Sequence, residues 1–352
     1  MSSTPFPLFS LPYVPLKQVF DNLGPHGIIN FSLCSQKSRN MATSYRGPSK
    51  SIKIEIHFGR DDCILYRINF KKHWLLSVSE IKKEDQGLDT VRIGNFEKRI
   101  PVEMDENGYL KTYWEDRMVG MSILGDYIRQ VFNRDIHQLL LGEEHKENDH
   151  RRAVGWLMAS QNEQVKHLCC NFEPRADKDL DNILETCNYT ERLQLLVKPS
   201  ENYRPTKIPN LNVSQISIYP SFWIHLDHLL TMNARTIVLT DSKLSNEDIN
   251  IFLKHWMNGG CFELKSFVIF MHSSMDPINY QVVMNGIQFI NRNRELKRSY
   301  VNHENRPYTV RGGVDIQRSI DGVTATVLDR SLELNRFHLV VWPDFAGNSH
   351  LP

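Results

Sequence analysis

Residues 234–269 read ARTIVLTDSKLSNEDINIFLKHWMNGGCFELKSFVI, and this stretch decides the fold class. The apolar runs ARTIVL and LKSFVI at its two ends resemble each other and predict two short strands. Between them, Ser245 is followed three residues later by Asp248, as in a helix capping box, and Gly259-Gly260 ends the helical pattern. A strand, a helix and a second strand in succession predict an α/β unit.

Similar apolar runs occur upstream and predict strands centred near Leu168, Leu195 and Ile216. With the two runs at Val238 and Val268, the five predicted strands lie 21 to 30 residues apart. This spacing overlaps the period of leucine-rich repeats, about 20 to 29 residues. Residues 150–342 are therefore expected to form a degenerate, leucine-rich-repeat-like α/β array. Alternating residues around 314–325 and 337–341 predict a C-terminal β-hairpin that caps the open edge of this array.

Residues 50–142 have a different period, and they predict a small antiparallel sheet followed by a helix. Apolar and polar residues alternate over 52–58 and 64–70, which predicts two strands with one buried face. Further strand-like pieces occur at 91–93, 100–104 and 109–114.

A helical pattern then covers 123–132, and the apolar residues 139–141 are expected to extend this helix or begin another. The charged run 143–152 is interpreted as an exposed connection.

The first 45 residues predict three short helices, which makes the overall class α+β. Leu16, Val19, Phe20 and Leu23 fall on one face of a helix. Gly24-Pro25 breaks it and opens a second helix, and Ser35 is placed to cap a third helix that runs to Ser44. A unit of this size buries little surface, so it would gain stability from a partner.

The composition excludes several classes of protein. The chain has 352 residues, 41% of them hydrophobic and 24% charged, with a net charge of +1. A disordered chain would be less apolar, and a whole-chain nucleic-acid binder would be more basic. The charge is uneven, because residues 1–50 hold five basic residues and one acidic residue, a net charge of +4.

Targeting signals are not expected. The first basic residue is Lys17, prolines interrupt the apolar residues before it, and no apolar run approaches the roughly 20 residues that span a bilayer. We therefore expect a soluble protein of the cytoplasm, the nucleus or both, with no membrane partner.

The sequence does not contain the common catalytic motifs. It has no Gly-x-Ser-x-Gly elbow, phosphate-binding loop or dinucleotide fingerprint. His167 with Cys169 and Cys170 lacks the second ligand pair of a zinc site, so buried thiols are favoured. The cluster of His225, Asp227 and His228 is explained more simply by a helix start. We expect no catalytic, cofactor-binding or metal-binding residues and no enzyme activity, although a hidden enzyme site around this histidine cluster stays open as a minor alternative.

Two further motifs have simple interpretations. Arg292, Arg294, Lys297 and Arg298 form a basic cluster, for which a solvated surface is favoured over a nucleic-acid contact. Gly312-Gly313 is interpreted as a turn.

Residues 6–46 resemble an F-box. Leu11-Pro12 matches the opening of that motif, and the apolar positions of its first helix follow in register. The segment from Pro25 to Ser35 matches the Pro-x-x-Leu-Leu-x-Leu-x-Leu-Val-Ser pattern, and a basic and apolar tail continues to Met41. Ser38 stands where many F-boxes have Trp.

The later part of the chain is similar to the type-2 F-box-associated domain of the large nematode F-box group. The similarity is strongest over 205–342 and rests on these segments: Ser221-Phe222-Trp223, Leu229-Leu230, Ser242-Lys243-Leu244, 252–260, Gly312-Gly313, Asp315-Ile316 and Asp321-Gly322.

This resemblance implies a substrate-recognition subunit of a cullin–RING ubiquitin ligase. The F-box would bind the Skp-type adaptor over an interface of about 1,200 Å² or more, and the C-terminal domain would hold an unknown target protein. The implied adaptor-binding residues are Leu11, Pro12, Leu16, Val19, Phe20, Leu23, Pro25, Ile28, Ile29 and Leu33. The alternative is a protein-interaction module with a degenerate F-box that acts outside any ubiquitin ligase.

Overall fold

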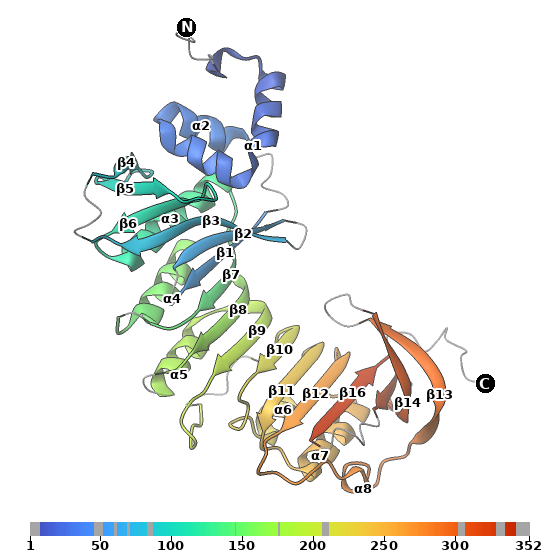
Figure 1. The fold of residues 1–352 in the computed structure, drawn as a ribbon. Helices are drawn as coiled ribbons and strands as arrows, with labels where there is room; N and C mark the ends of the chain where they lie inside the picture. Colours follow the sequence, from blue (N-terminus) through green and yellow to red (C-terminus); the bar gives the residue numbers. More distant parts are fainter. Residues whose placement is uncertain are drawn as a thin grey trace. The chain divides into compact units, whose positions relative to one another are not determined.

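The computed structural model describes residues 8–45, 52–59, 62–68, 71–82, 87–144, 146–174, 177–205, 211–301, 307–328 and 335–342 (Figure 1). The chain forms two compact units, residues 1–165 and 166–352. The three-part division at 6–46, 50–142 and 150–342 is finer than these units and stays a prediction.

The first unit begins with helices. A short 3-10 helix, Leu8–Ser10, precedes α1 (Tyr13–Cys34) and α2 (Gln36–Tyr45). α1 is kinked at Gly24, whose φ of 67° and ψ of 172° are not helical, directly before Pro25. The break predicted at Gly24-Pro25 is therefore present, but the three-helix unit is not confirmed as such, because the segments on either side of Gly24 run on directly as α1. The start of α2 is capped as expected, since the Ser38 backbone N–H donates to Ser35 Oγ at 3.0 Å.

The sheet of the first unit is mixed. Its strand order is β7-β1-β2-β3-β6-β5-β4, and the bounds are β1 Lys53–Phe58, β2 Cys63–Ile68, β3 Lys71–Glu80, β4 Asp89–Arg92, β5 Arg99–Met104, β6 Leu110–Trp114 and β7 Ile136–Leu141. β1 pairs with β7, and β3 with β6, in parallel, whereas the other pairs are antiparallel. The expectation of a purely antiparallel sheet was wrong, because long connections bring β6 and β7 back in the same direction as their partners.

Two expectations for the region after the sheet were also wrong. Residues 139–141 lie in strand β7 and not in a helix, since pairing with β1 overrides the local pattern. The charged run 143–152 is only partly an exposed connection, because α4 (Asp149–Ser160) begins inside it and Asp149 and His150 are buried. The helix expected over 123–132 is confirmed as part of α3 (Arg117–Phe132), which Asp116 caps.

The second unit contains all five expected strands, which are β8 (Val165–Phe172), β9 (Tyr189–Val197), β10 (Gln215–Ile218), β11 (Thr236–Ser242) and β12 (Ser266–Met271). β9 to β12 run parallel. Helix α5 (Asp177–Thr186) lies between β8 and β9 in the chain, α6 (Leu226–Thr231) between β10 and β11, and α7 (Asn246–Met257) between β11 and β12. The α/β alternation is confirmed, whereas the leucine-rich-repeat-like character is not confirmed and stays a prediction.

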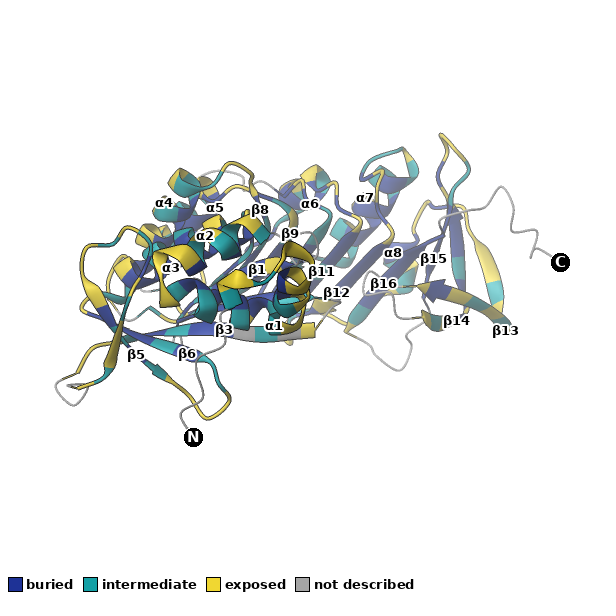
Figure 2. Cartoon of the chain, turned by 90° about the horizontal axis from the view of Figure 1, so that it is seen from above, coloured by how far each residue is buried: buried dark blue, intermediate teal, exposed yellow. Residues whose placement is uncertain are grey.

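α7 is built as its sequence predicts and covers the parallel strands. The Ser245 hydroxyl accepts from the Asp248 backbone N–H at 3.1 Å, which completes the capping box. The buried side of the helix places Phe252 on Phe267 of β12, with ring centroids 4.5 Å apart. Figure 2 shows the strands beneath this helix as buried. The core of the unit therefore lies between α7 and the sheet.

The C-terminal part extends the parallel strands by an antiparallel sheet. A short helix, α8 (Tyr280–Val283), precedes β13 (Ile290–Val301), β14 (Pro307–Gln317), β15 (Thr324–Val327) and β16 (Arg336–Val341). β16 pairs with β12, as expected of a strand that caps the array, and β15, β14 and β13 follow in that order. β13 was not expected from the sequence.

The Gly312-Gly313 pair lies inside β14, so its assignment to a turn was wrong. Both residues have a positive φ, 57° and 99°. A Cβ on Gly313 would come within 2.6 Å of Thr326 Cγ2 and 2.7 Å of the Val327 carbonyl oxygen. Glycine is thus required here by the close approach of β15 rather than by a reversal of the chain.

Candidate functional site

The structure divides the ten predicted adaptor-binding residues by exposure. Leu16, Phe20, Pro25, Ile28 and Ile29 are buried. The partly exposed residues are Leu11, Val19, Leu23 and Leu33, and Pro12 is exposed. About half of the predicted set therefore supports the helices from inside, and the other half reaches the surface.

The second half of α1 is fixed to the rest of the first unit. Ile28 and Ile29 are 1% and 0% exposed, and the Tyr127 hydroxyl of α3 donates to Ser32 Oγ at 2.8 Å. Arg39 of α2 lies 3.5 Å from Asn95 Oδ1. The small N-terminal helices thus complete their core against β3, β4 and α3 of the same unit.

The first turn of α1 presents large apolar side chains to the surface. Tyr13 and Val14 are 73% and 66% exposed, and Phe9 just before them is 38% exposed. Tyr13 and Val14 are not among the residues predicted from the sequence, because they fall outside the apolar stripe that begins at Leu16. Two exposed apolar residues at a helix start, next to that stripe, are the signal that would have identified them.

A cavity of about 270 Å³ lies between α1 and α2. Its wall is mainly apolar and aromatic with two lysines, and the lining residues are Tyr13, Leu16, Lys17, Phe20, Lys37, Asn40, Met41, Ser44 and Tyr45. Phe20 and Tyr45 stack with their ring centroids 4.8 Å apart, so one wall of the cavity is aromatic.

The charges around the cavity are predominantly positive. Lys17 Nζ bonds to Asp21 Oδ2 at 2.9 Å, and the Tyr45 hydroxyl also bonds to Asp21. The hydrogen bond from Tyr45, followed by that from Lys17, lowers the pKa of the Asp21 carboxyl. In turn, the hydrogen bond to Asp21 raises the pKa of Lys17. Lys37 Nζ lies 4.6 Å above the Phe9 ring. The surface therefore fits an apolar side chain flanked by acidic groups.

Ser38 has a defined structural role at the start of α2. It is 3% exposed, and its hydroxyl lies 2.8 Å from Ser35 Oγ in addition to the backbone bond described above. A small polar side chain at this position therefore fits the capped helix, although many F-boxes have Trp there.

The histidine cluster of the second unit is a helix start. The His225 backbone N–H donates to Nδ1 of His228 at 3.2 Å, and Asp227 is exposed. Burial lowers the pKa of His228 below its ordinary value. These contacts are explained by capping of α6.

The neighbouring cysteines lie in β8, with Cys170 buried and Cys169 half-buried. Burial raises the pKa of Cys170, as is typical of an unreactive thiol. Within the described ranges, no group of three or more His, Cys, Asp and Glu residues is placed to hold a metal ion. Nor does the described part of the chain include a helix long and apolar enough to span a membrane.

Two known protein families match this chain, one in each of its two units. Residues 8–49 match the F-box domain, and residues 204–269 match the family described as F-box associated. The chain contains an F-box and an F-box-associated domain. The F-box comprises α1, α2 and the cavity between them, and the F-box-associated match covers β10 to α7 and the start of β12.

The relatives of this F-box chain are nematode proteins. The "Skn-1 dependent zygotic transcript 15 protein" of Caenorhabditis elegans is 23% identical over 270 residues, which cover 72% of this chain and 75% of that protein. The uncharacterized proteins F59B2.8 and F59B2.9 of the same organism are each 22% identical, and the aligned regions cover 58% and 59% of their lengths. No solved structure matches this F-box chain.

Proposed function

We propose that this chain is a substrate-recognition subunit of a cullin–RING ubiquitin ligase. Its F-box binds a Skp-type adaptor, and its second unit holds a target protein, in the cytoplasm, the nucleus or both. The chain itself is not catalytic. It acts by proximity, because a held target presents its lysines at a high effective concentration to the ubiquitin carrier.

One observation supports adaptor binding most directly, which is the exposed apolar start of the F-box. Tyr13 and Val14 lie in the first turn of α1 and are exposed, and Tyr13 also lines the cavity between α1 and α2. Large exposed apolar side chains beside an aromatic cavity are typical of a protein interface. The adaptor is thus expected to cover Tyr13 and Val14 together with Leu11, Pro12, Val19, Leu23 and Leu33.

The buried members of the predicted set have a supporting role in this proposal. Leu16, Phe20, Ile28 and Ile29 hold α1 in place, so their replacement would damage the fold before it reported on binding. The decisive substitution must therefore be made at an exposed residue.

The test is recovery of a Skp-type adaptor by the full chain and by Val14→Asp. We expect Val14→Asp to weaken adaptor binding at least about tenfold, since a charge would be buried at the centre of the interface. Met104→Asp is the matched control, because Met104 is 52% exposed in the same unit but outside the F-box. It should leave binding unchanged. Equal binding by the wild-type chain and Val14→Asp contradicts the proposed interface, and absence of adaptor from the wild-type chain contradicts the proposed function.

The same preparation separates the two ways in which an F-box protein can act. Recovery of a cullin together with the adaptor supports the ligase. Recovery of the adaptor without a cullin supports an interaction module outside a ligase.

A further inference from the structure

β13 is the outermost strand of the C-terminal sheet and has an exposed edge. It stands at the end of the strand order of the described residues, with β14 as its neighbour (Figure 1). Its twelve residues are mostly exposed, as Figure 2 also shows. Apolar side chains lie at both of its ends, since Phe289 and Ile290 are 46% and 58% exposed and Val301 is 57% exposed. Such a strand offers backbone N–H and C=O groups to a further strand.

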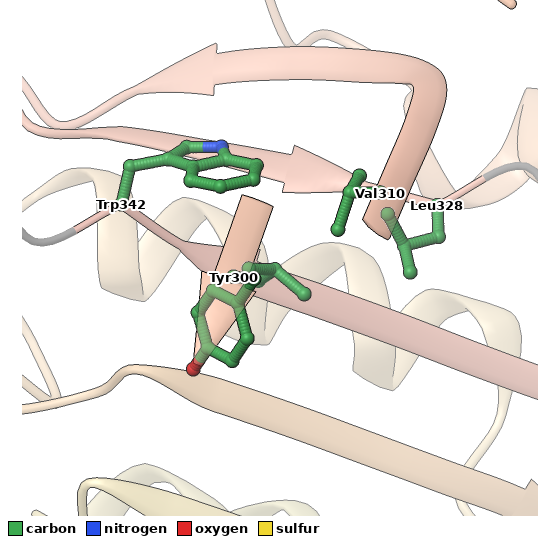
Figure 3. Close-up of a cluster of buried hydrophobic side chains, with 5 residues drawn as sticks. Tyr300, Val310, Leu328 and Trp342 are labelled. Carbon is green, nitrogen blue, oxygen red and sulfur yellow. The ribbon is translucent and has the colours of Figure 1, made fainter. Parts of the chain in front are cut away.

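The β13–β14 hairpin is held firmly on its inner side. Arg292 Nε and both terminal nitrogens of Arg298 bond to the carboxylate of Asp315 at 2.7 to 3.0 Å, and Asp315 is 3% exposed. The Arg298 guanidinium also lies 4.6 Å from the centre of the Trp342 ring, and Trp342 belongs to the buried cluster of Tyr300, Val310, Leu328, Val340 and Trp342 (Figure 3). Half of the basic cluster seen in the sequence, Arg292 and Arg298, is thus structural, and these ion pairs hold β13 to β14.

The outer side of the same hairpin has unbalanced positive charge. Lys297 of β13 lies directly opposite Arg311 of β14, and both are exposed. Glu295 is the one acidic residue in the sequence of β13. Two like charges directly opposite each other on neighbouring strands are destabilising in an isolated sheet, so this pairing points to a ligand of opposite charge.

We propose that β13 binds an extended, acidic segment of a partner protein, which adds to the sheet as a further strand. The inference rests on the proposed function in that the partner would be the target held by the second unit. Backbone hydrogen bonds to the edge would supply affinity, and carboxylates at alternate positions would face Lys297 and Arg311.

The positive charges also oppose pairing of this edge with a basic strand. A second copy of β13 would place its own cations against Lys297 and Arg311, so self-association through this edge is opposed. An acidic strand turns that repulsion into attraction. The regular stretch from Lys297 to Val301, which pairs with 307–311, is long enough for the central contacts.

The test uses the purified full chain and a fluorescent twelve-residue peptide of alternating glutamate and threonine. Binding is measured by anisotropy. We expect the double variant Lys297→Glu with Arg311→Glu to weaken binding at least about tenfold. The control Lys178→Glu with Lys198→Glu changes the net charge equally at exposed positions of the same unit and should stay within twofold of the wild-type chain.

A second arm needs no variant of the protein. The same peptide with N-methyl groups on alternate residues keeps its charge but loses backbone donors, and it should bind the wild-type chain at least about tenfold more weakly. Equal binding of the methylated peptide would show plain charge attraction and overturn strand addition. Tighter binding of a twelve-nucleotide single-stranded RNA, lost in the same double variant, would identify a nucleic-acid surface instead.

Failure here is separate from failure of the proposed function. A chain that recovers the adaptor but does not bind the acidic peptide refutes only the role of β13. Binding of the peptide without recovery of the adaptor refutes the ligase role and leaves the strand-binding edge in place.

Discussion

Replacement of Asp315 by Asn tests whether one buried carboxylate organises the C-terminal sheet. Asp315 accepts hydrogen bonds from Arg292, Arg298 and Thr326. The side chains of the two arginines are only 16% and 13% exposed, so water can replace the carboxylate only in part. Asn has nearly the same shape but no charge, and it leaves two guanidinium groups side by side without a counter-charge.

The expected loss follows from that geometry. Removal of one partner from a buried ion pair usually costs about 3 to 5 kcal/mol. Because Asn still accepts one hydrogen bond, we expect the lower end, about 3 kcal/mol, for Asp315→Asn. Adding Arg298→Met should recover part of this loss, since one uncompensated charge is then removed.

Urea unfolding followed by circular dichroism measures this change, and hydrogen exchange of 307–317 locates it. Glu263→Gln is the matched control, because Glu263 forms an exposed ion pair with Arg235 in the same unit. It should change the free energy of unfolding by less than about 1 kcal/mol. An Asp315→Asn chain within about 1 kcal/mol of wild type, with unchanged exchange in β14, would refute the role assigned to the carboxylate.

Gly313→Ala should destabilise the second unit by about 2 kcal/mol or more in thermal or urea unfolding, because it combines a positive φ with contacts at 2.6 and 2.7 Å. Gly155→Ala, in helix α4 with open space around its Cβ, should instead stabilise by about 0.5 to 1 kcal/mol, and a similar loss in both variants would contradict the packing at Gly313. Burial lowers the pKa of His228 from 6.5, so the unfolded chain binds the proton first and the free energy of unfolding should fall as the pH drops below 6.5. His228→Gln should make this fall shallower in urea titrations at about pH 7.5 and 5.5, and an unchanged fall would assign it to other groups.

Local signals in the sequence predicted the regular elements well. Helix α7 follows from its capping box at Ser245 and Asp248 and from its apolar stripe, all within one short segment. The five strands β8 to β12 follow from apolar runs between helical patterns. In each case the residues that decide the structure are neighbours in the chain.

The expectations that failed depend on residues far apart in the sequence. Gly312-Gly313 suggested a turn, but the pair lies inside β14, where the close approach of Thr326 and Val327 from another strand requires Gly313. The basic cluster suggested a solvated surface, but Arg292 and Arg298 turn inward to a carboxylate 23 and 17 residues away. The position of Asp315 in the folded sheet therefore decides which basic residues of the cluster turn inward and which, such as Lys297, remain exposed.

The candidate site shows the same division. The F-box motif could be recognised in the sequence, and its apolar positions identified the segment that forms helix α1. It could not separate the residues that support α1, such as Ile28 and Ile29, from those that reach the surface, because both kinds are apolar. Burial against α3 decides between them, and Tyr127 lies 95 residues beyond its partner Ser32.

The anchoring of α1 has a practical consequence for dissecting this protein. The helix that exposes Tyr13 and Val14 at one end contributes Ile28 and Ile29 to the interior of the first unit at the other. A truncation that starts after residue 46 therefore removes part of the core along with the binding surface, and it leaves the hydroxyl of Tyr127 without Ser32. We expect such a chain to lose the proposed adaptor surface and to have a destabilised first unit. The fragment we expect to keep the proposed adaptor surface together with the core that supports it is the whole first unit, residues 1–165.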